Sequence, residues 1–293
     1  MIITKLIGGL GNQMFQYAAG LSLAKKHDTS LRLDINFLLD KSKRYYRHTH
    51  RDFALDIFNI SGSVATDDEI REHVVPRKGN KYVYHLIMKL QKQNRVYSES
   101  SVSSIDDFFQ IPSSAYIQGS WQDTKYFEDI ELALRREFSF RDALPESHDY
   151  IYKEIKRHEA VCVVFRRGDY VGHPVLDIVG LDYYYEATNI IARRIKDPYF
   201  FVFSDDIEWC KKNFASENGT MMFVDQKYTG PKAQYYLKLM SECKHYIIPN
   251  STYPWWGAWL CQNPEKLVVA PKLWYKGQPS ERSNILMKDW ISL

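Results

Sequence analysis

Residues 161–170, VCVVFRRGDY, contain the pattern on which the fold prediction depends. The apolar run 161–165 is typical of a strand buried on both faces, and it leads directly into Arg166, Arg167, Gly168 and Asp169. Helical patterns separate this run from four further predicted strands, at 199–203, 221–224, 245–249 and 266–270. Strands that alternate with helices predict parallel βαβ units, so we expect a doubly wound sheet in the second half of the chain.

The first half begins with the same alternation. Residues 2–7 predict a buried strand, 8–11 (GGLG) a turn, the residues from Asn12 onward a helix, and 31–35 a second strand. A strand is also predicted at 116–119. Asp123 and Thr124 are predicted to cap a helix with an apolar face of Phe127, Ile130, Leu134 and Phe138. Residues 141–148 form the candidate linker, so we expect two α/β domains, 1–150 and 151–293.

Composition limits the classes of partner. The chain has 293 residues, of which 45% are hydrophobic, and a net charge of +3, which is too small to argue for nucleic acid. Its four cysteines lack metal-binding spacing and fit a reducing compartment, which indicates a cytoplasmic protein. No signal peptide and no apolar run of membrane-spanning length is found, although contact with a membrane surface stays compatible with the sequence.

Polar residues follow the predicted strands of the second half. In doubly wound sheets ligands bind at the carboxyl ends of the strands, so these residues are the candidate site. Most of them are of types that bind phosphate or hydroxyl groups. They are Arg166 to Asp169, then Ser204, Asp205 and Asp206, then Asp225, then Asn250, Ser251 and Thr252, then Pro271 and Lys272.

The arginine pair is the strongest phosphate-binding candidate in this set. On extended chain Arg166 and Arg167 point to opposite sides, so one can reach a ligand while the other pairs with Asp169 or a neighbouring acid. The planar guanidinium matches phosphate oxygens, and Gly168 permits a sharp turn or a close approach. The alternative is a surface ion pair beside a turn.

Two further motifs have both structural and functional interpretations. Ser251 and Thr252 stand where hydroxyls either cap a helix or bind phosphate, and the acidic pair Asp205–Asp206 is more typical of a helix cap than of a metal site. No P-loop pattern and no G-x-S-x-G pattern occurs.

The glycine turn suggests an alternative function. Gly9-x-Gly11 follows a strand and opens a helix, and Asp34 lies at the distance expected for a dinucleotide-binding fingerprint. Met14 occupies the third glycine position, which weakens that match. A dinucleotide-dependent oxidoreductase is thus one alternative to a nucleotide-sugar enzyme, and a non-catalytic nucleotide- or glycan-binding protein is another.

Four motifs together resemble the bacterial α-1,2-fucosyltransferases of glycosyltransferase family 11. They occur in the family order and span nearly the whole chain: GGLGNQMFQYA at 8–18, RRGDYV at 166–171, FSDD at 203–206, and NST with WWGAWL at 250–260. The resemblance implies a GT-B-type fold of two facing Rossmann-like domains, inverting transfer from GDP-fucose to the 2-hydroxyl of a galactoside, and no metal or other cofactor.

The resemblance also implies residue roles. The second domain would bind the donor through Arg166, Arg167, Ser204, Asp205, Asn250, Ser251 and Thr252, with Asp205 as a ribose or guanine contact. The first domain would add Gly9, Gly11 and Gln13 to donor binding and would supply Asn12 and most of the acceptor surface. Arg166 would stabilise the leaving phosphate, and Asn12 would contact the reacting groups. Asp169 would act as general base or orient Arg167. The family usually has His where this chain has Val164, and Ser where it has Pro254.

Overall fold

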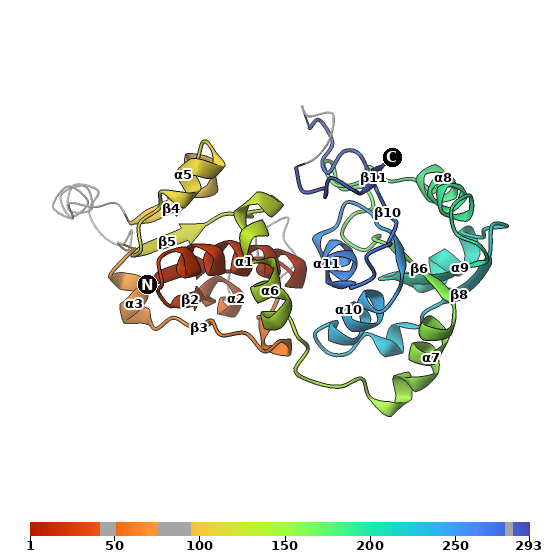
Figure 1. The fold of residues 1–293 in the computed structure, drawn as a ribbon, viewed down its shortest axis with the longest axis horizontal. Coiled ribbons are helices and arrows are strands. Elements are labelled where there is room, and N and C mark those ends of the chain that lie inside the picture. Colours follow the sequence, from red (N-terminus) through yellow and green to blue (C-terminus); the bar gives the residue numbers. More distant parts are fainter. Residues whose placement is uncertain (42–50, 75–94, 279–283) are drawn as a thin grey trace. The chain divides into compact units, whose positions relative to one another are not determined.

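The computed structural model describes residues 1–41, 51–74, 95–278 and 284–293, which form two compact α/β units (Figure 1). The first unit is Met1–Arg141 and the second is Asp142–Leu293. The division lies before the expected boundary at residue 150, because helix α7 (Asp149–Arg157) packs against the second sheet through the buried Ile151 and Ile155.

The first unit contains a five-stranded sheet in which all strands are parallel, in the order β3-β2-β1-β5-β4. The strands predicted at 2–7, 31–35 and 116–119 are confirmed with slightly different ends, whereas two short strands were not predicted. The five are β1 (Ile2–Lys5), β2 (Leu31–Asp34), β3 (Ser63–Val64), β4 (Val96–Ser98) and β5 (Ala115–Gln118).

The long helix α1 (Leu10–Lys26) carries most of the helical core of this unit, and it begins at Leu10, two residues before the predicted start. The other helices among the described residues of this unit are short: α2 (Asn36–Leu39), α3 (Asp67–Arg71), α5 (Ile105–Phe109) and α6 (Glu131–Glu137), with 3-10 turns at Leu55–Ile57, Glu99–Ser101, Thr124–Tyr126 and Glu128–Ile130.

The prediction of one helix after Asp123 is wrong in its first half. Asp123 does cap, since its side chain accepts a hydrogen bond from the amide of Lys125 at 3.0 Å. However, Phe127 has a φ of −147°, outside the helical region, so two 3-10 turns precede α6. Phe127, Leu134 and Phe138 still reach the core, because tertiary packing buries them without a continuous helix.

The second unit contains a six-stranded parallel sheet in the order β11-β10-β9-β6-β7-β8. The doubly wound parallel sheet predicted from the 161–170 pattern is confirmed, and β11 is an additional short strand. The six are β6 (Glu159–Phe165), β7 (Pro198–Ser204), β8 (Thr220–Phe223), β9 (His245–Ile247), β10 (Val268–Ala270) and β11 (Ile291–Ser292).

Helices cover both faces of this sheet (Figure 1). Helices α8 (Leu181–Ala192) and α9 (Ile207–Asn213) pack on one face, where Val161, Val163 and Phe165 form a core with Tyr184 and Cys210. On the other face Phe203 contacts Tyr236 of α10 (Gln234–Ser241), which packs with α11 (Thr252–Leu260). Two 3-10 turns lie at Glu146–His148 and Gln226–Tyr228.

Each sheet has one point where the strand order reverses. In the second unit the chain runs outward from β6 through β7 and β8, then returns to place β9 on the other side of β6. In the first unit β1 and β5 are the corresponding pair. Ligands of open α/β sheets bind outside the carboxyl ends of the strands at such switch points, so the loops after these strands carry the candidate sites.

Candidate functional site

The switch point of the second sheet brings most of the predicted donor-site residues to one edge. Arg166 to Asp169 follow β6, Ser204 to Asp206 follow β7, and Asn250 to Thr252 follow β9. Because β6 pairs in parallel with both β7 and β9, these three loops are neighbours. Residues separated by more than 80 positions in the sequence therefore share one edge.

Arg166 is held from two sides by carboxylates. Its Nη2 donates to Oδ1 of Asp169 at 2.5 Å, and its Nη1 donates to Oδ2 of Asp205. Its guanidinium carbon also lies 5.4 Å from the centre of the Tyr170 ring. One quarter of the Arg166 side chain stays exposed, so an oriented cation faces the edge of the sheet.

Asp205 binds the loop that follows β6. Besides Arg166, its carboxylate accepts hydrogen bonds from the backbone amides of Arg167 at 2.8 Å and Gly168 at 3.1 Å. The sequence placed Asp205 in the donor site as a ribose or guanine contact. The structure instead directs both carboxylate oxygens to protein donors.

Arg167 is turned toward helix α9. Its guanidinium carbon lies 3.4 Å from the centre of the Trp209 ring, and its Nε donates to Oδ2 of Asp206 at 3.2 Å. Asp206 also caps α9, since its Oδ1 accepts from the amide of Trp209 at 3.2 Å. The cap predicted for the acidic pair is thus confirmed at Asp206. Of the two partners that the sequence left open, Asp169 or a neighbouring acid, Arg167 pairs with the neighbouring acid Asp206, whereas Asp169 pairs with Arg166.

Tyr170 links the arginine loop to the loop after β9. Its hydroxyl donates to the carbonyl oxygen of Asn250 at 3.2 Å, and it also hydrogen-bonds with the Ser251 side chain. Burial raises the pKa of Tyr170, and the Ser251 hydrogen bond opposes that rise. The phenol therefore stays protonated at neutral pH and connects the two loops of the switch point.

The residues Asn250 and Ser251 differ in what their side chains do. Asn250 is buried, and its Nδ2 donates to the carbonyl oxygens of Leu176 and Trp274, both at 3.0 Å. Ser251 is the N-cap of α11, but within the described residues its hydroxyl makes no capping hydrogen bond. Asn250 thus ties together two loops, while the Ser251 hydroxyl lies beside Tyr170.

The two departures from the family pattern are both buried. Val164 is 5% exposed and offers only its carbonyl oxygen, which accepts from the Tyr184 hydroxyl at 2.9 Å. Pro254 lies in the first turn of α11, where the missing amide hydrogen costs nothing. The side chain of Val164 therefore supplies no polar contact, and Pro254 leaves the helix intact.

The first unit holds the remaining predicted residues together at the end of β1. Gly8 has a φ of +78°, which favours glycine, and Gly9 is the N-cap of α1. The side-chain oxygen of Asn12 accepts from Nε2 of Gln122 at 3.2 Å, across the switch point between β1 and β5. A Cβ on Gly9 would lie 4.0 Å from the Arg51 side chain, a neighbour that the motifs of the sequence did not indicate.

Gln13 has a structural role in this loop. Its fully buried amide donates to the carbonyl oxygens of Gly8 and Asp52, both at 2.9 Å, and accepts from the amide of Ala54 at 3.0 Å. Its side chain therefore anchors residues 52–54 rather than facing a ligand.

Asp34 does not support the dinucleotide alternative. Its buried carboxylate accepts from the Tyr116 hydroxyl at 2.7 Å and from the amide of Asn36 at 2.9 Å. A carboxylate that binds a ribose must face the ligand, whereas this one is turned into the protein.

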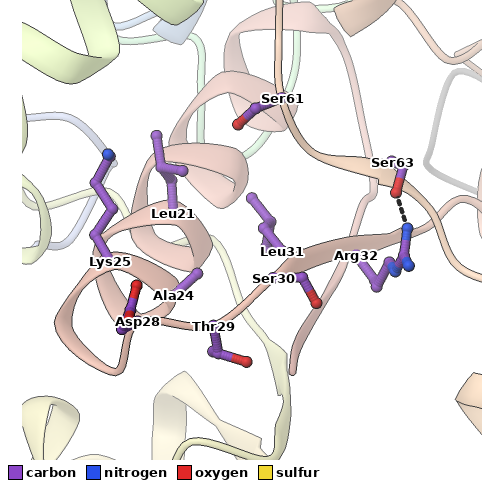
Figure 2. Close-up of a pocket in the computed structure, with 10 residues that line it drawn as sticks. All are labelled: Leu21, Ala24, Lys25, Asp28, Thr29, Ser30, Leu31, Arg32, Ser61 and Ser63. Atoms are coloured by element: carbon purple, nitrogen blue, oxygen red, sulfur yellow. Dashed lines mark hydrogen bonds between the residues drawn. The ribbon is translucent and has the colours of Figure 1, made fainter.

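A cavity of about 500 Å³ in the first unit lies away from these loops (Figure 2). Its lining includes Ser30 and Leu31 at the start of β2 and Ser63 at the start of β3, so it opens at the amino ends of the strands. Arg32, on its wall, is paired with Ser63 and with Glu69. The Gly9–Asn12 loop follows the carboxyl end of β1, at the opposite edge of the same sheet.

The described residues, 1–41, 51–74, 95–278 and 284–293, contain neither a cluster of metal ligands nor a membrane-spanning helix. In these ranges no group of three or more His, Cys, Asp and Glu side chains is arranged to hold a metal ion. Within the same ranges no helix combines the length and the apolar character needed to cross a bilayer.

Comparison with known sequences gives a consistent result over the whole chain. The sequence model of Glycosyl transferase family 11 matches residues 1–293. An α-1,2-colitosyltransferase of Escherichia coli is 30% identical, covering 100% of this chain and 99% of its own length. The O-antigen biosynthesis glycosyltransferase WbnK of Escherichia coli is 32% identical, covering 98% and 99%. The galactoside α-(1,2)-fucosyltransferase 1 of Mus musculus is 26% identical, covering 86% of this chain and 61% of its own length.

A solved structure gives the class of fold. The fucosyltransferase NodZ from Bradyrhizobium is similar with a TM-score of 0.51 at 16% identity, covering 88% of this chain and 92% of NodZ. The predicted GT-B-type α/β fold with two parallel sheets is thereby confirmed.

Proposed function

Because the chain belongs to glycosyltransferase family 11, we propose that it is an inverting galactoside α-1,2-fucosyltransferase. In this proposal it transfers fucose from GDP-fucose to the 2-hydroxyl of a terminal galactose in an oligosaccharide or surface polysaccharide. The names of the relatives support the α-1,2 linkage, and NodZ crystals soaked with GDP-fucose support the donor class.

The observation that carries the proposal is the placement of Arg166. It lies at the switch point of the second sheet, beside the loop that carries Ser251, and its guanidinium is oriented by two carboxylates. A GDP diphosphate at this edge would meet a preformed cation and a hydroxyl group. Arginine forks bind phosphate oxygens in this way.

The chemistry gives Arg166 its task. The acceptor oxygen bonds to the anomeric carbon of fucose while the bond from that carbon to the β-phosphate oxygen breaks, so the configuration inverts and GDP leaves. Negative charge grows on the departing phosphate, and a base takes the proton of the acceptor hydroxyl. A cation fixed before the reaction stabilises that charge without reorganisation, so Arg166 needs no metal ion beside it.

Asp169 has two candidate tasks in this scheme, base or orienting group. In the structure its Oδ1 bonds to Arg166 at 2.5 Å, which supports orientation of the phosphate-binding arginine. We therefore favour the orienting role, and a pH–rate profile distinguishes the two.

The remaining proposals concern the roles of the two units, the cellular compartment and the membrane. We propose that the second unit binds GDP-fucose and that the first unit contributes the Gly9–Asn12 loop and most of the acceptor contacts. The four cysteines are buried and unpaired, which suits a reducing compartment such as the cytoplasm. Association with a membrane surface is compatible with this proposal.

A donor and acceptor panel tests the proposal. The purified chain is incubated with GDP-fucose and β-galactosides, and products are identified by mass and by linkage analysis. The matched acceptor is a 2-deoxygalactoside, which should give no product. GDP-colitose is included because of the 30% identical colitosyltransferase, and chelator-treated enzyme tests metal independence. Transfer to the 2-deoxy acceptor would contradict the proposal. The absence of product with both GDP-fucose and GDP-colitose would also contradict it.

Arg166→Ala should lower turnover by on the order of a hundredfold or more, the usual cost of losing one preorganised donor. Arg193→Ala, which removes an exposed arginine at the end of α8, is the matched control. Turnover within a few-fold of the unmodified enzyme in Arg166→Ala would remove Arg166 from the mechanism.

A further inference from the structure

We infer that Asp205 is a positioning residue, which fixes the Arg166 guanidinium and the turn after β6 rather than contacting the donor itself. The inference rests on the proposed function for its activity measurements, although its structural readout does not. Within the Ser204–Asp206 loop, Asp205 therefore has a role different from that of Asp206.

Three donors from one loop converge on the Asp205 carboxylate. Oδ1 accepts from the amide of Arg167 at 2.8 Å. Oδ2 accepts from the amide of Gly168 at 3.1 Å and from Nη1 of Arg166. Two successive backbone amides and a guanidinium thus share one carboxylate, so the acid sets the direction of both the backbone and the side chain.

The position of Gly168 is independent support. A Cβ on this residue would stand 2.9 Å from Oδ2 of Asp205, closer than real Cβ atoms approach an oxygen. With a side chain at this position, the Asp205 carboxylate would have to shift away from the loop backbone. Gly168 is not among the residues with positive φ, so close approach is the reason for glycine here.

Asp205 and Asp206 thus have different structural roles at the start of α9. Asp206 caps the helix and pairs with Arg167, so it fastens the loop to α9. Asp205 faces the other way, onto Arg166. With Asp169 on the second terminal nitrogen, Asp205 completes a fork-shaped holder that leaves the guanidinium preorganised, which is the condition for stabilising a leaving phosphate.

Asp205→Asn is the most informative substitution because asparagine keeps the size of aspartate. It replaces one acceptor oxygen by an NH₂ donor, so either the Arg167 amide or the pair formed by Arg166 and Gly168 would face a donor instead of an acceptor. Losing a hydrogen bond to a charged group costs about tenfold or more in an equilibrium or rate that depends on it. Glu208→Gln removes a neighbouring exposed carboxylate, bonded to Lys211, and is the matched control.

The experiment is a double-mutant cycle. The unmodified enzyme, Asp205→Asn, Arg166→Ala, the double variant and Glu208→Gln are compared in kcat/KM for GDP-fucose and in GDP affinity by calorimetry. Asp205→Asn should lose about tenfold or more in the presence of Arg166 but less than about twofold in the Arg166→Ala background. Glu208→Gln should match the unmodified enzyme. An equal loss in both backgrounds would overturn the inference, because it would mean that Asp205 contacts the donor itself or acts on folding.

Two measurements keep the test independent of the proposed donor. If GDP binds but fucose is not transferred, the proposed function fails. The double-mutant cycle measured as GDP affinities still decides the role of Asp205 in that case. Backbone ¹⁵N NMR of the ligand-free enzyme decides it without any nucleotide: Asp205→Asn should shift the Arg167 and Gly168 amide resonances, and unchanged resonances would overturn the inference. If the Asn variant does not fold, Asp205→Glu, which moves the carboxylate by one methylene, passes through the same measurements.

Discussion

The guanidinium of Arg167 stacks on the indole of Trp209, with 3.4 Å between the guanidinium carbon and the ring centre. Arg166, the residue before it, has its guanidinium between two carboxylates at the edge of the sheet. Two adjacent residues of one type thus have different surroundings, because successive side chains of extended chain point to opposite sides.

This difference predicts opposite effects of two similar substitutions. Arg167→Ala should lower the free energy of unfolding by about 1–2 kcal/mol, since it removes the stacking and the Asp206 hydrogen bond that join the loop to α9. Arg166→Ala should leave the melting temperature nearly unchanged and abolish most activity. Thermal unfolding and initial rates on both variants check this pair. A larger stability loss in Arg166→Ala than in Arg167→Ala would contradict it.

Gly168→Ala should reproduce the loss of activity of Asp205→Asn. The added methyl would stand 2.9 Å from Oδ2 of Asp205 and 3.6 Å from its Cγ, so the carboxylate must move and release Arg166. We expect a fall of about tenfold or more in kcat/KM, by loss of the same charged hydrogen bonds. Gly180→Ala is the control, because a Cβ there meets nothing within 4 Å and its φ of −93° suits alanine. Equal activity in the two alanine variants would show that the Gly168 contact is unimportant.

Much of this architecture was predictable because it depends on patterns of residue type. The apolar run before Arg166 predicted a buried strand, and its alternation with helices predicted the parallel sheet that the structure confirms. Strand-end position also predicted which loops share an edge. These inferences hold since burial and chain connectivity alone decide them.

The direction in which a polar side chain points was not predictable. Gln13 lies in the first turn of α1 and Asn250 lies after β9, and both are of ligand-binding types. Their amides nevertheless bond to backbone groups of distant segments. Trp209 gave no signal as a partner of Arg167, because nothing in a linear pattern places a ring from α9 over the end of β6. Such contacts depend on packing between segments far apart in sequence.

Asp169→Asn should lower kcat while keeping the acidic limb of the pH–rate profile. If Asp169 orients Arg166 through its 2.5 Å hydrogen bond, the Asn variant weakens that orientation at every pH without removing the group that titrates. If Asp169 is the general base, the acidic limb disappears instead. The profile is measured with saturating acceptor between about pH 3 and about pH 9, a range that spans the ordinary pKa values of a carboxylate and of an imidazole.

Asn250→Ala should destabilise the second unit. The buried amide donates to the carbonyl oxygens of Leu176 and Trp274, and its removal leaves both without that donor in the interior. Each unsatisfied buried polar group costs about 1–3 kcal/mol. We expect a lower melting temperature together with faster proteolysis in the loops around residues 176 and 274. Unaltered stability would indicate that water replaces the amide.

The buried thiols predict a pH dependence of stability. Burial raises the pKa of Cys210 to about 11 and also raises the pKa of Cys162. The native chain therefore keeps protons that the unfolded chain releases above the ordinary thiol value of 9.0, so the free energy of unfolding falls as the pH rises from there toward 11. Below about pH 8 the thiols give the free energy of unfolding no pH dependence, since they are protonated in both the native and the unfolded chain. Urea unfolding at pH 7.5 and 10 should show the fall, and Cys210→Ala should reduce it.

A thiol reagent at pH 8 should label none of the four cysteines until the protein is unfolded, and rapid labelling of the native enzyme would contradict the buried positions.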